Sequence, residues 1–438
     1  MRTRRRATRG LSSALCALLW LVPLGSAFSE TLEDAWGDAL AGDLTLQAAA
    51  ERVAAAQAAV EAARGGRRPS VGIASTVTQW DTTPAFDFSG VGMPSQLALF
   101  GGQSMVMSEA RVSFPLYTGG QVSSVLDATT ASATARQAEA EALSLEVKRS
   151  VAEHFVAVLR AESALAVAAA NAESLTAHSR DVADMYASGQ VPRNDQLAAG
   201  VSLADAKQQE LQARNRLDVA RAAYNRSTGR ELDSPVALDP VFPSAHTALA
   251  ANPLDALVAM ARENRHELTS FDAVVSELTA QSAAMRGSTR PQLLLQGGWT
   301  FLENDVLNRE DFWTVGVGFQ WNLFDGGRSR DSAAALSHQA SAAARDRANM
   351  LTVIELDVRA AWLNVRETRE RVPVTREAVA QAEENLRVVR DRYRNGEGTN
   401  TEVLDAEVLR SLSRNNYDTA RYDAALAEIT LARAVGLL

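Results

Sequence analysis

The stretches FPLYTGGQ (residues 114–121) and WNLFDGGR (residues 321–328) decide the fold, because they are two copies of one phrase. Both read aromatic-x-Leu-aromatic-x-Gly-Gly, and they lie 207 residues apart. Alternating apolar residues precede each copy, and a long alanine-rich stretch follows it. Glycine has no side chain and wide backbone freedom, so a strand is predicted to turn into a helix at each pair. These junction residues are Gly119, Gly120, Gly326 and Gly327.

The repeated phrase belongs to a duplication of nearly the whole chain. Tyr186 and Tyr393 share the offset of 207, as do Gly229 and Gly436. Upstream of the phrase the offset is 222, so the first copy holds 15 extra residues between Pro69 and Phe114. A long internal period predicts repeated structural units. We therefore expect a first repeat at 28–229, a proline-rich connector at 230–252 on the outside of the body, and a second repeat at 253–438.

Each repeat has the same predicted order of elements. A helix (31–64 and 253–286) comes first and is followed by a β-hairpin (about 70–117 and 292–324). A helix of about 65 residues comes next (121–187 and 328–394), and at 1.5 Å per residue it is about 100 Å long. A turn and a second long helix, which ends at Gly229 or Gly436, complete the repeat. Such lengths are typical of coiled coils, and Pro373 is expected to kink its helix.

The hairpins carry a pattern that suits a membrane surface. Trp313, Val315 and Val317 alternate with Thr314 and Gly316, which is the period of a strand with one apolar face. Strands of about ten residues match a tilted crossing of a bilayer. Trp80, Trp299, Trp313 and Trp321 are expected in the four strands, since membrane interfaces favour tryptophan. The alternative is one face of a soluble sandwich, but two hairpins are too little sheet to close a core.

The N-terminal residues 1–27 have the form of a signal peptide. Arginines precede an apolar run of 14 residues that ends in GSA, and this run is shorter than the roughly 20 residues of a membrane span. The alternative is an uncleaved anchor helix. The single cysteine, Cys16, lies in this segment and follows Leu15, so neither lipidation nor a disulfide is expected. We expect no later segment to be even a candidate transmembrane helix.

The charge of the chain argues against nucleic acid as a partner. The whole chain has 44 basic and 53 acidic residues. Removing the five arginines of the signal segment leaves 39 basic against 53 acidic residues, a net charge of −14. Phosphate backbones require the opposite sign.

With these elements in order, the sequence resembles the TolC family of outer-membrane efflux ducts. The resemblance covers nearly the whole mature chain and rests on the duplicated plan, the two Gly-Gly phrases, the proline after each first helix, and YRNGEGTNTEVLDAE (393–407). It implies a mainly α fold with membrane β: a homotrimer whose chains each give four strands to one 12-stranded outer-membrane β-barrel. The antiparallel coiled coils would form an α-barrel across the periplasm.

The resemblance also implies a function, partners and site residues. The protein would be a passive exit duct of a tripartite efflux or type I secretion system, set in outer-membrane lipid. A periplasmic adaptor (membrane fusion) protein and an inner-membrane pump would be its partners. Glu402 and Asp405 match the acidic entrance at the periplasmic tip, and Asp195 is the repeat partner of Glu402. Asp195 and Tyr393, with Tyr186 in the other repeat, are expected to hold the tip closed by hydrogen bonds between helices.

One residue departs from the family pattern, and the acids have a simpler explanation as well. Asn400 stands where the family often has a basic residue, so a lock that relies on an arginine is in doubt. Acids in the first turn of a helix also cap it and interact favourably with its dipole. That role and a role in the entrance can coexist.

No residues suggest catalysis, a cofactor or a metal site. The five histidines (His154, His178, His246, His266 and His338) are scattered without the spacing of a zinc helix, and we expect them to be packing or surface residues. The main alternative function is an outer-membrane-anchored structural coiled coil without an open lumen. The segment 81–104, which holds the extra residues of the first copy, is expected to be a surface loop.

Overall fold

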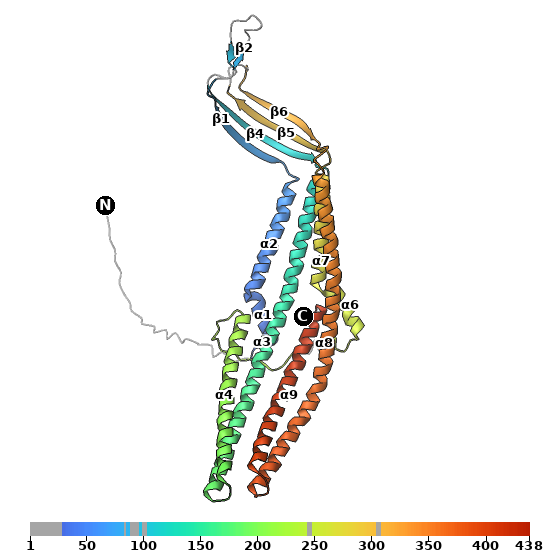
Figure 1. Ribbon diagram of the computed structural model, residues 1–438. Coiled ribbons are helices and arrows are strands. Elements are labelled where there is room, and N and C mark those ends of the chain that lie inside the picture. Colours follow the sequence, from blue (N-terminus) through green and yellow to red (C-terminus); the bar gives the residue numbers. More distant parts are fainter. Residues whose placement is uncertain (1–28, 83–84, 88–95, 99–102, 243–247, 304–307) are drawn as a thin grey trace, which may run out of the picture.

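The protein is an elongated molecule with a sheet at one end and, at the other, two turns that each connect a pair of long helices (Figure 1). This computed structural model describes residues 29–82, 85–87, 96–98, 103–242, 248–303 and 308–438. The predicted signal segment with Cys16, part of the 81–104 segment and His246 lie outside these residues. The fold is mainly helical with one four-stranded antiparallel sheet, as the sequence predicts.

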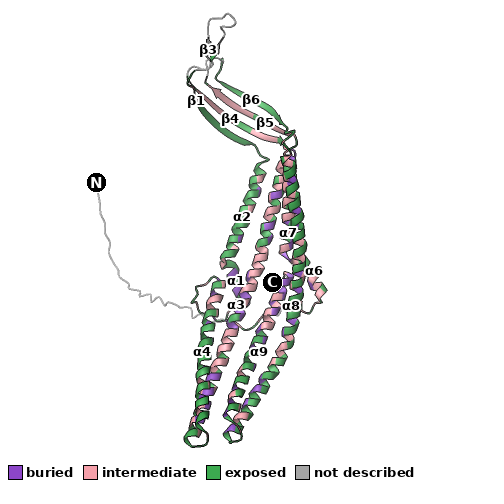
Figure 2. Cartoon of the chain, viewed as in Figure 1, coloured by how far each residue is buried: buried purple, intermediate pink, exposed green. Residues whose placement is uncertain are grey.

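The sheet is built from one hairpin of each repeat. Its strands are β1 (Ser70–Gln79), β4 (Ser104–Tyr117), β5 (Gln292–Leu302) and β6 (Asp311–Gln320), in the spatial order β1-β4-β5-β6. The pairing of β4 with β5 joins the two repeats, with Ala110 opposite Trp299. β1 and β6 are the two edges, and Figure 2 shows both as exposed.

Two of the four tryptophans lie just outside the strands in which they were predicted. β1 ends at Gln79 and β6 at Gln320, so Trp80 and Trp321 each follow the last strand residue. Trp321 instead donates from Nε1 to the carbonyl of Thr289 at 3.1 Å, which ties the strand exit to the turn before β5. The 81–104 segment also contains a small hairpin of β2 (Ala85–Asp87) and β3 (Gln96–Ala98), which alternation did not reveal.

The long helices have the predicted bounds. They are α3 (Gln121–Ala187) and α8 (Arg328–Arg394), which return through α4 (Arg193–Ser227) and α9 (Asn400–Val435). Pro373 lies inside α8, and the helix continues through it. In both repeats the two long helices pack against each other and converge on one end of the molecule (Figure 1).

The first helix of each repeat is broken in two, which the sequence analysis missed. The segments are α1 (Leu32–Gly42) with α2 (Leu44–Gly65), and α6 (Leu254–Asn264) with α7 (His266–Gly287). The first break occurs at Asp43, whose carboxylate accepts hydrogen bonds from the backbone amides of Thr45 (2.7 Å) and Leu46 (3.0 Å). The alanine-rich sequence around Asp43 favours helix and so hides this cap.

Two apolar clusters form the core halfway along the helices. In the first repeat Leu32, Phe155 and Tyr224 are fully buried, and the rings of Phe155 and Tyr224 meet edge to face. In the second repeat Leu257, Ile354 and Leu431 are fully buried. The connector also adds to the core, because Val236 and Leu238 are buried in the first cluster. The connector therefore lies partly inside the body, contrary to the prediction that it lies on the outside.

One helix contradicts the prediction that no later segment resembles a transmembrane helix. By length and composition alone, α3 contains a stretch long and apolar enough to cross a membrane, and a third of that stretch is buried in the protein. α3 packs along its length against α2, α4, α7 and α9.

All four junction glycines have a left-handed backbone. Gly119 and Gly120 have φ of 63° and 87°, and Gly326 and Gly327 have φ of 74° and 87°. Gly120 and Gly327 are the residues directly before α3 and α8. Residues with a Cβ rarely adopt this conformation, which costs them about 1–2 kcal/mol.

We predict that Gly119→Ala destabilises the protein more than Gly326→Ala, although both sites have positive φ. A Cβ at Gly119 would lie 2.6 Å from Cβ of Arg290 and 2.7 Å from the carbonyl oxygen of Gly287, whereas a Cβ at Gly326 meets open space. Overpacking of this kind adds about 1–3 kcal/mol to the shared backbone cost. Thermal unfolding of the two variants checks the difference, and equal losses of stability would contradict the account of Gly119.

Candidate functional site at the helical tip

The tip consists of two turns with the same geometry. The α3–α4 turn places Gly189 at φ 76°, and the α8–α9 turn places Gly396 at φ 78°. The amide of Gln190 donates to the carbonyl of Met185, and that of Glu397 donates to the carbonyl of Arg392, both at 2.8 Å. Duplicated sequence has therefore produced two matching re-entrant turns. They lie side by side at the end of the molecule away from the sheet (Figure 1).

A small apolar cluster joins all four long helices just inside the turns. It contains Val182 of α3, Ala199 of α4, Tyr393 of α8 and Val403 of α9, each at most 5% exposed. Tyr186, by contrast, is 39% exposed and lies at the last turn of α3. Tyr393 and Tyr186 are repeat partners, but only Tyr393 packs into the cluster.

A buried polar chain connects three helices at the same level. Nε2 of His178 on α3 lies 2.7 Å from Oδ1 of Asn400, the first residue of α9. Nδ2 of Asn400 donates to the backbone carbonyl of Asp195 on α4 at 3.2 Å. Asn400 is 3% exposed and His178 is 6% exposed. Because the Asn400 amide must donate to a carbonyl, its oxygen faces His178, and Nε2 of His178 carries the proton.

Tyr393 contributes to the tip by packing rather than through its hydroxyl. Its ring lies 5.6 Å from the ring of His178, between centroids. Its buried hydroxyl has no hydrogen-bond partner among the described residues of this chain. Burial raises the pKa of Tyr393, and the nearby Asp195 carboxylate raises that pKa further. Among the described residues of the chain, the Tyr393 hydroxyl and the Asp195 carboxylate therefore do not make the predicted hydrogen bonds between helices. Asn400 makes such a bond instead, and its acceptor is the backbone carbonyl of Asp195.

The two predicted entrance acids lie on the exposed part of the first turns of α9. Glu402 forms a capping box with Thr399, with N–O distances of 3.3 and 3.4 Å, and lies 3.8 Å from the guanidinium of Arg392. Asp405 is exposed, and no ion pair found among the described residues includes it. The helix-capping role of Glu402 is therefore present, and both carboxylates remain accessible to solvent.

A third acid in the same segment, Glu407, is the buried one, and it is not among the residues predicted from the sequence. Glu407 is 1% exposed and pairs with Arg390 of α8 and with Arg410 at 3.1 Å. It also accepts a hydrogen bond from Oγ of Ser174 on α3 at 2.7 Å. Helical spacing could have indicated that Glu407 differs from Glu402. Glu407 lies five residues later in α9 and therefore on a different face of the helix. This network holds α3, α8 and α9 together above the apolar cluster.

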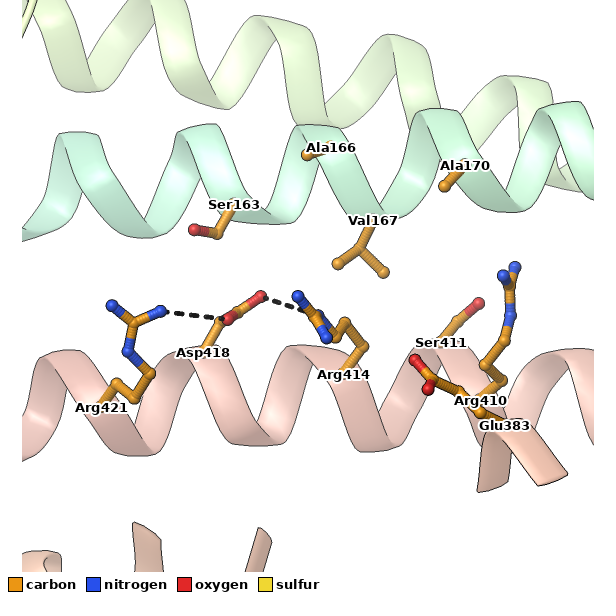
Figure 3. Close-up of a pocket in the computed structure, with 10 residues that line it drawn as sticks. All are labelled: Ser163, Ala166, Val167, Ala170, Glu383, Arg410, Ser411, Arg414, Asp418 and Arg421. Carbon is orange, nitrogen blue, oxygen red and sulfur yellow. Dashed lines mark ion pairs between the residues drawn. The ribbon is translucent and has the colours of Figure 1, made fainter. Parts of the chain in front are cut away.

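A cavity of about 510 Å³ separates the two coiled-coil pairs farther from the tip (Figure 3). Asp418 of α9 lies between Arg414 and Arg421, with N–O distances of 3.9 and 4.0 Å. Small side chains of α3, such as Ala166 and Ala170, line the opposite side of the cavity. The pairs meet again beyond the cavity, where Arg160 of α3 pairs with Asp423 of α9. The cavity thus separates the contacts near the tip from those at Arg160 and Asp423.

Comparison with known proteins agrees with this geometry. The model of the family described as "Outer membrane efflux protein" matches residues 35–230 and 257–437, which are the two repeats. The chain belongs to this family. The outer membrane efflux protein BepC of Brucella suis biovar 1 (strain 1330) is 31% identical over 194 residues, which are 44% of this chain and 42% of BepC. The match therefore spans less than half of the length of that curated relative.

Solved structures of outer-membrane channels share the fold of this family member over almost its full length. The outer-membrane channel OprN matches with a TM-score of 0.79 at 18% identity, covering 92% of this chain and 89% of OprN. The outer membrane protein VceC of Vibrio cholerae matches with a TM-score of 0.79 at 17% identity, covering 92% and 96%. The CmeC outer membrane channel of Campylobacter jejuni matches with a TM-score of 0.78 at 15% identity, covering 99% and 93%. At these identities the likeness concerns the fold.

Proposed function

We propose that three copies of this chain form a passive exit duct of a tripartite efflux or type I secretion system in the outer membrane. The observation that carries the proposal is the open sheet. Its edge strands β1 and β6 have unpaired backbone groups, and its apolar face is bare, with Ile73 84%, Val315 83% and Trp313 79% exposed. In lipid every backbone group must be paired, so only a closed barrel satisfies such a sheet. Three four-stranded sheets give twelve strands, within the even-numbered bacterial range.

The helices supply the rest of the duct in this proposal. Long helices with exposed apolar stripes, such as Leu197, Val201 and Leu211 on α4, need neighbouring copies to cover them. The assembled helices would cross the periplasm and narrow at the tip, where a periplasmic adaptor and an inner-membrane pump deliver the cargo. The family match and the channel-like fold support this assignment, and no cofactor or nucleic acid enters it.

The tip acids would then form a cation filter at the entrance. Three copies place six carboxylates, from Glu402 and Asp405, around a narrow opening, and rings of acids favour cations. We predict that Glu402→Ala with Asp405→Ala weakens cation selectivity and reduces block by multivalent cations in planar bilayers. The Glu402→Gln with Asp405→Asn variant should have the same effect. It removes the two charges but keeps the helix cap, because glutamine still completes the capping box.

The matched control removes the same charge far from the tip. Glu231→Ala with Asp233→Ala changes two exposed acids of the connector and should leave selectivity unchanged. If the tip variants keep the reversal potential of the wild type, Glu402 and Asp405 are not part of a filter. The assembly itself is tested by the native mass of the protein in mild detergent.

A further inference from the structure

Charged side chains are rare in the sheet. Within β1, β4, β5 and β6 the only residues with a carboxylate or a basic group are Glu109, Arg111 and Asp311. Asp311 begins β6 at one end of the sheet, whereas Glu109 and Arg111 lie in the middle of β4. Residues two apart in a strand share one face, so these two charges project from the same side.

The two side chains pair with each other and have small neighbours. Nη2 of Arg111 lies 2.8 Å from Oε2 of Glu109. Arg111 stands opposite Gly72 on β1 and Gly298 on β5, and Glu109 stands opposite Ala74 and Thr300. Gly298 is required there, because a Cβ would lie 2.4 Å from the carbonyl oxygen of Ala110. The pair is therefore isolated from every other charge on this wall of the sheet.

A shallow hollow adjoins the pair on the polar side. Its volume is about 300 Å³, and polar side chains of β5 and β6 help to line it, namely Gln296, Thr300 and Thr314. Apolar side chains of the same strands, such as Val317, belong to the opposite, lipid-compatible face. When the apolar face meets lipid, the Glu109–Arg111 pair faces the lumen.

We propose that Glu109 and Arg111 form a charge-balanced ring on the inner wall of the assembled sheet, which keeps this end of the channel open to cargo of either charge sign. The inference rests on the proposed trimeric duct. Three copies contribute three carboxylates and three guanidinium groups, so the ring has no net charge. A ring with charges of one sign would attract multivalent counter-ions and hold them. The pairing thus distinguishes this end of the duct from the acidic tip.

The test is block of the current by multivalent ions added from the side of the sheet in planar bilayers. Block anywhere along the duct stops the current, so the test works even where the tip limits conductance. In Arg111→Gln three carboxylates lose their partners, and hexaamminecobalt(III) should block at about tenfold lower concentration than in the wild type. In Glu109→Gln three guanidinium groups lose theirs, and inositol hexakisphosphate should become the stronger blocker by a similar factor.

The double variant and an outer-face variant are the controls. Arg111→Gln with Glu109→Gln restores neutrality and should behave like the wild type, as should Asp311→Asn at the end of β6. Unchanged block in both single variants, with wild-type conductance and native mass, would overturn the charge-balanced ring and leave the duct standing. A protein that stays monomeric in mild detergent would instead remove the duct, and the ring with it.

Discussion

Replacing Asn400 with alanine is expected to open the tip and raise the single-channel conductance in planar bilayers several-fold. The substitution removes both hydrogen bonds of the buried chain between His178 and the Asp195 carbonyl. Each buried group that loses its partner costs about 1–3 kcal/mol, and the closed state bears this cost. A change of about 1.4 kcal/mol alters an equilibrium tenfold, and three copies would share the effect.

Asn194→Ala is the matched control for this prediction. Asn194 is exposed at the start of α4, and among the described residues its side chain donates only to the neighbouring Asp195 carboxylate, at 3.2 Å. The conductance of this variant should equal that of the wild type. His178→Phe keeps a ring against Tyr393 but removes Nε2, so it should open the tip less than Asn400→Ala does. Equal conductance in Asn400→Ala and Asn194→Ala would show that the buried chain does not hold the tip closed.

Arg265→Ala is expected to give the largest loss of stability, about 3–5 kcal/mol in the free energy of unfolding, as for other buried ion pairs that lose one partner. Arg265 is 4% exposed at the break between α6 and α7. Its guanidinium binds Glu267 at 2.9 Å and donates to the carbonyl of Ala434 near the end of α9 at 3.0 Å. Arg387→Ala is the control: that guanidinium is 61% exposed and pairs with Glu384, so its loss should cost less than about 1 kcal/mol.

The same ion pair predicts how stability depends on pH. Burial works to raise the pKa of Glu267, but hydrogen bonds from Arg265 and from the Glu267 backbone amide, with the charges of Arg265 and Arg433, outweigh it, so the pKa is lowered from 4.5. A lowered pKa in the folded state contributes stability above the unfolded value, and this stability is lost as the pH falls through the folded value. The wild type should therefore lose stability below about pH 4.5, with a smaller loss in Arg265→Ala. Unfolding followed from pH 7 to pH 3 checks this, and parallel curves would contradict it.

The repeated phrase was enough to predict the fold because each element type has a strong local signal. Alternation marks β6, a glycine pair marks each junction, and a long run without breakers, apart from Pro373 in α8, marks α3 and α8. The breaks at Asp43 and Arg265 were harder to predict, because a single glycine, Gly42, precedes the first and neither a glycine nor a proline adjoins the second. The tip residues show the same limit. Asn400 stood out as a departure from the family pattern, but only the fold brings it to His178 and Asp195.

The native mass of the mature protein, extracted from outer membranes in mild detergent, tests the central claim most directly. The account predicts a trimer, because the edges of β1 and β6 and the apolar stripes of α4 need neighbouring copies. A protein that stays monomeric in every mild detergent would contradict it. The four-stranded sheet would then have two open edges in lipid, and a structural coiled coil without a lumen would become the better description.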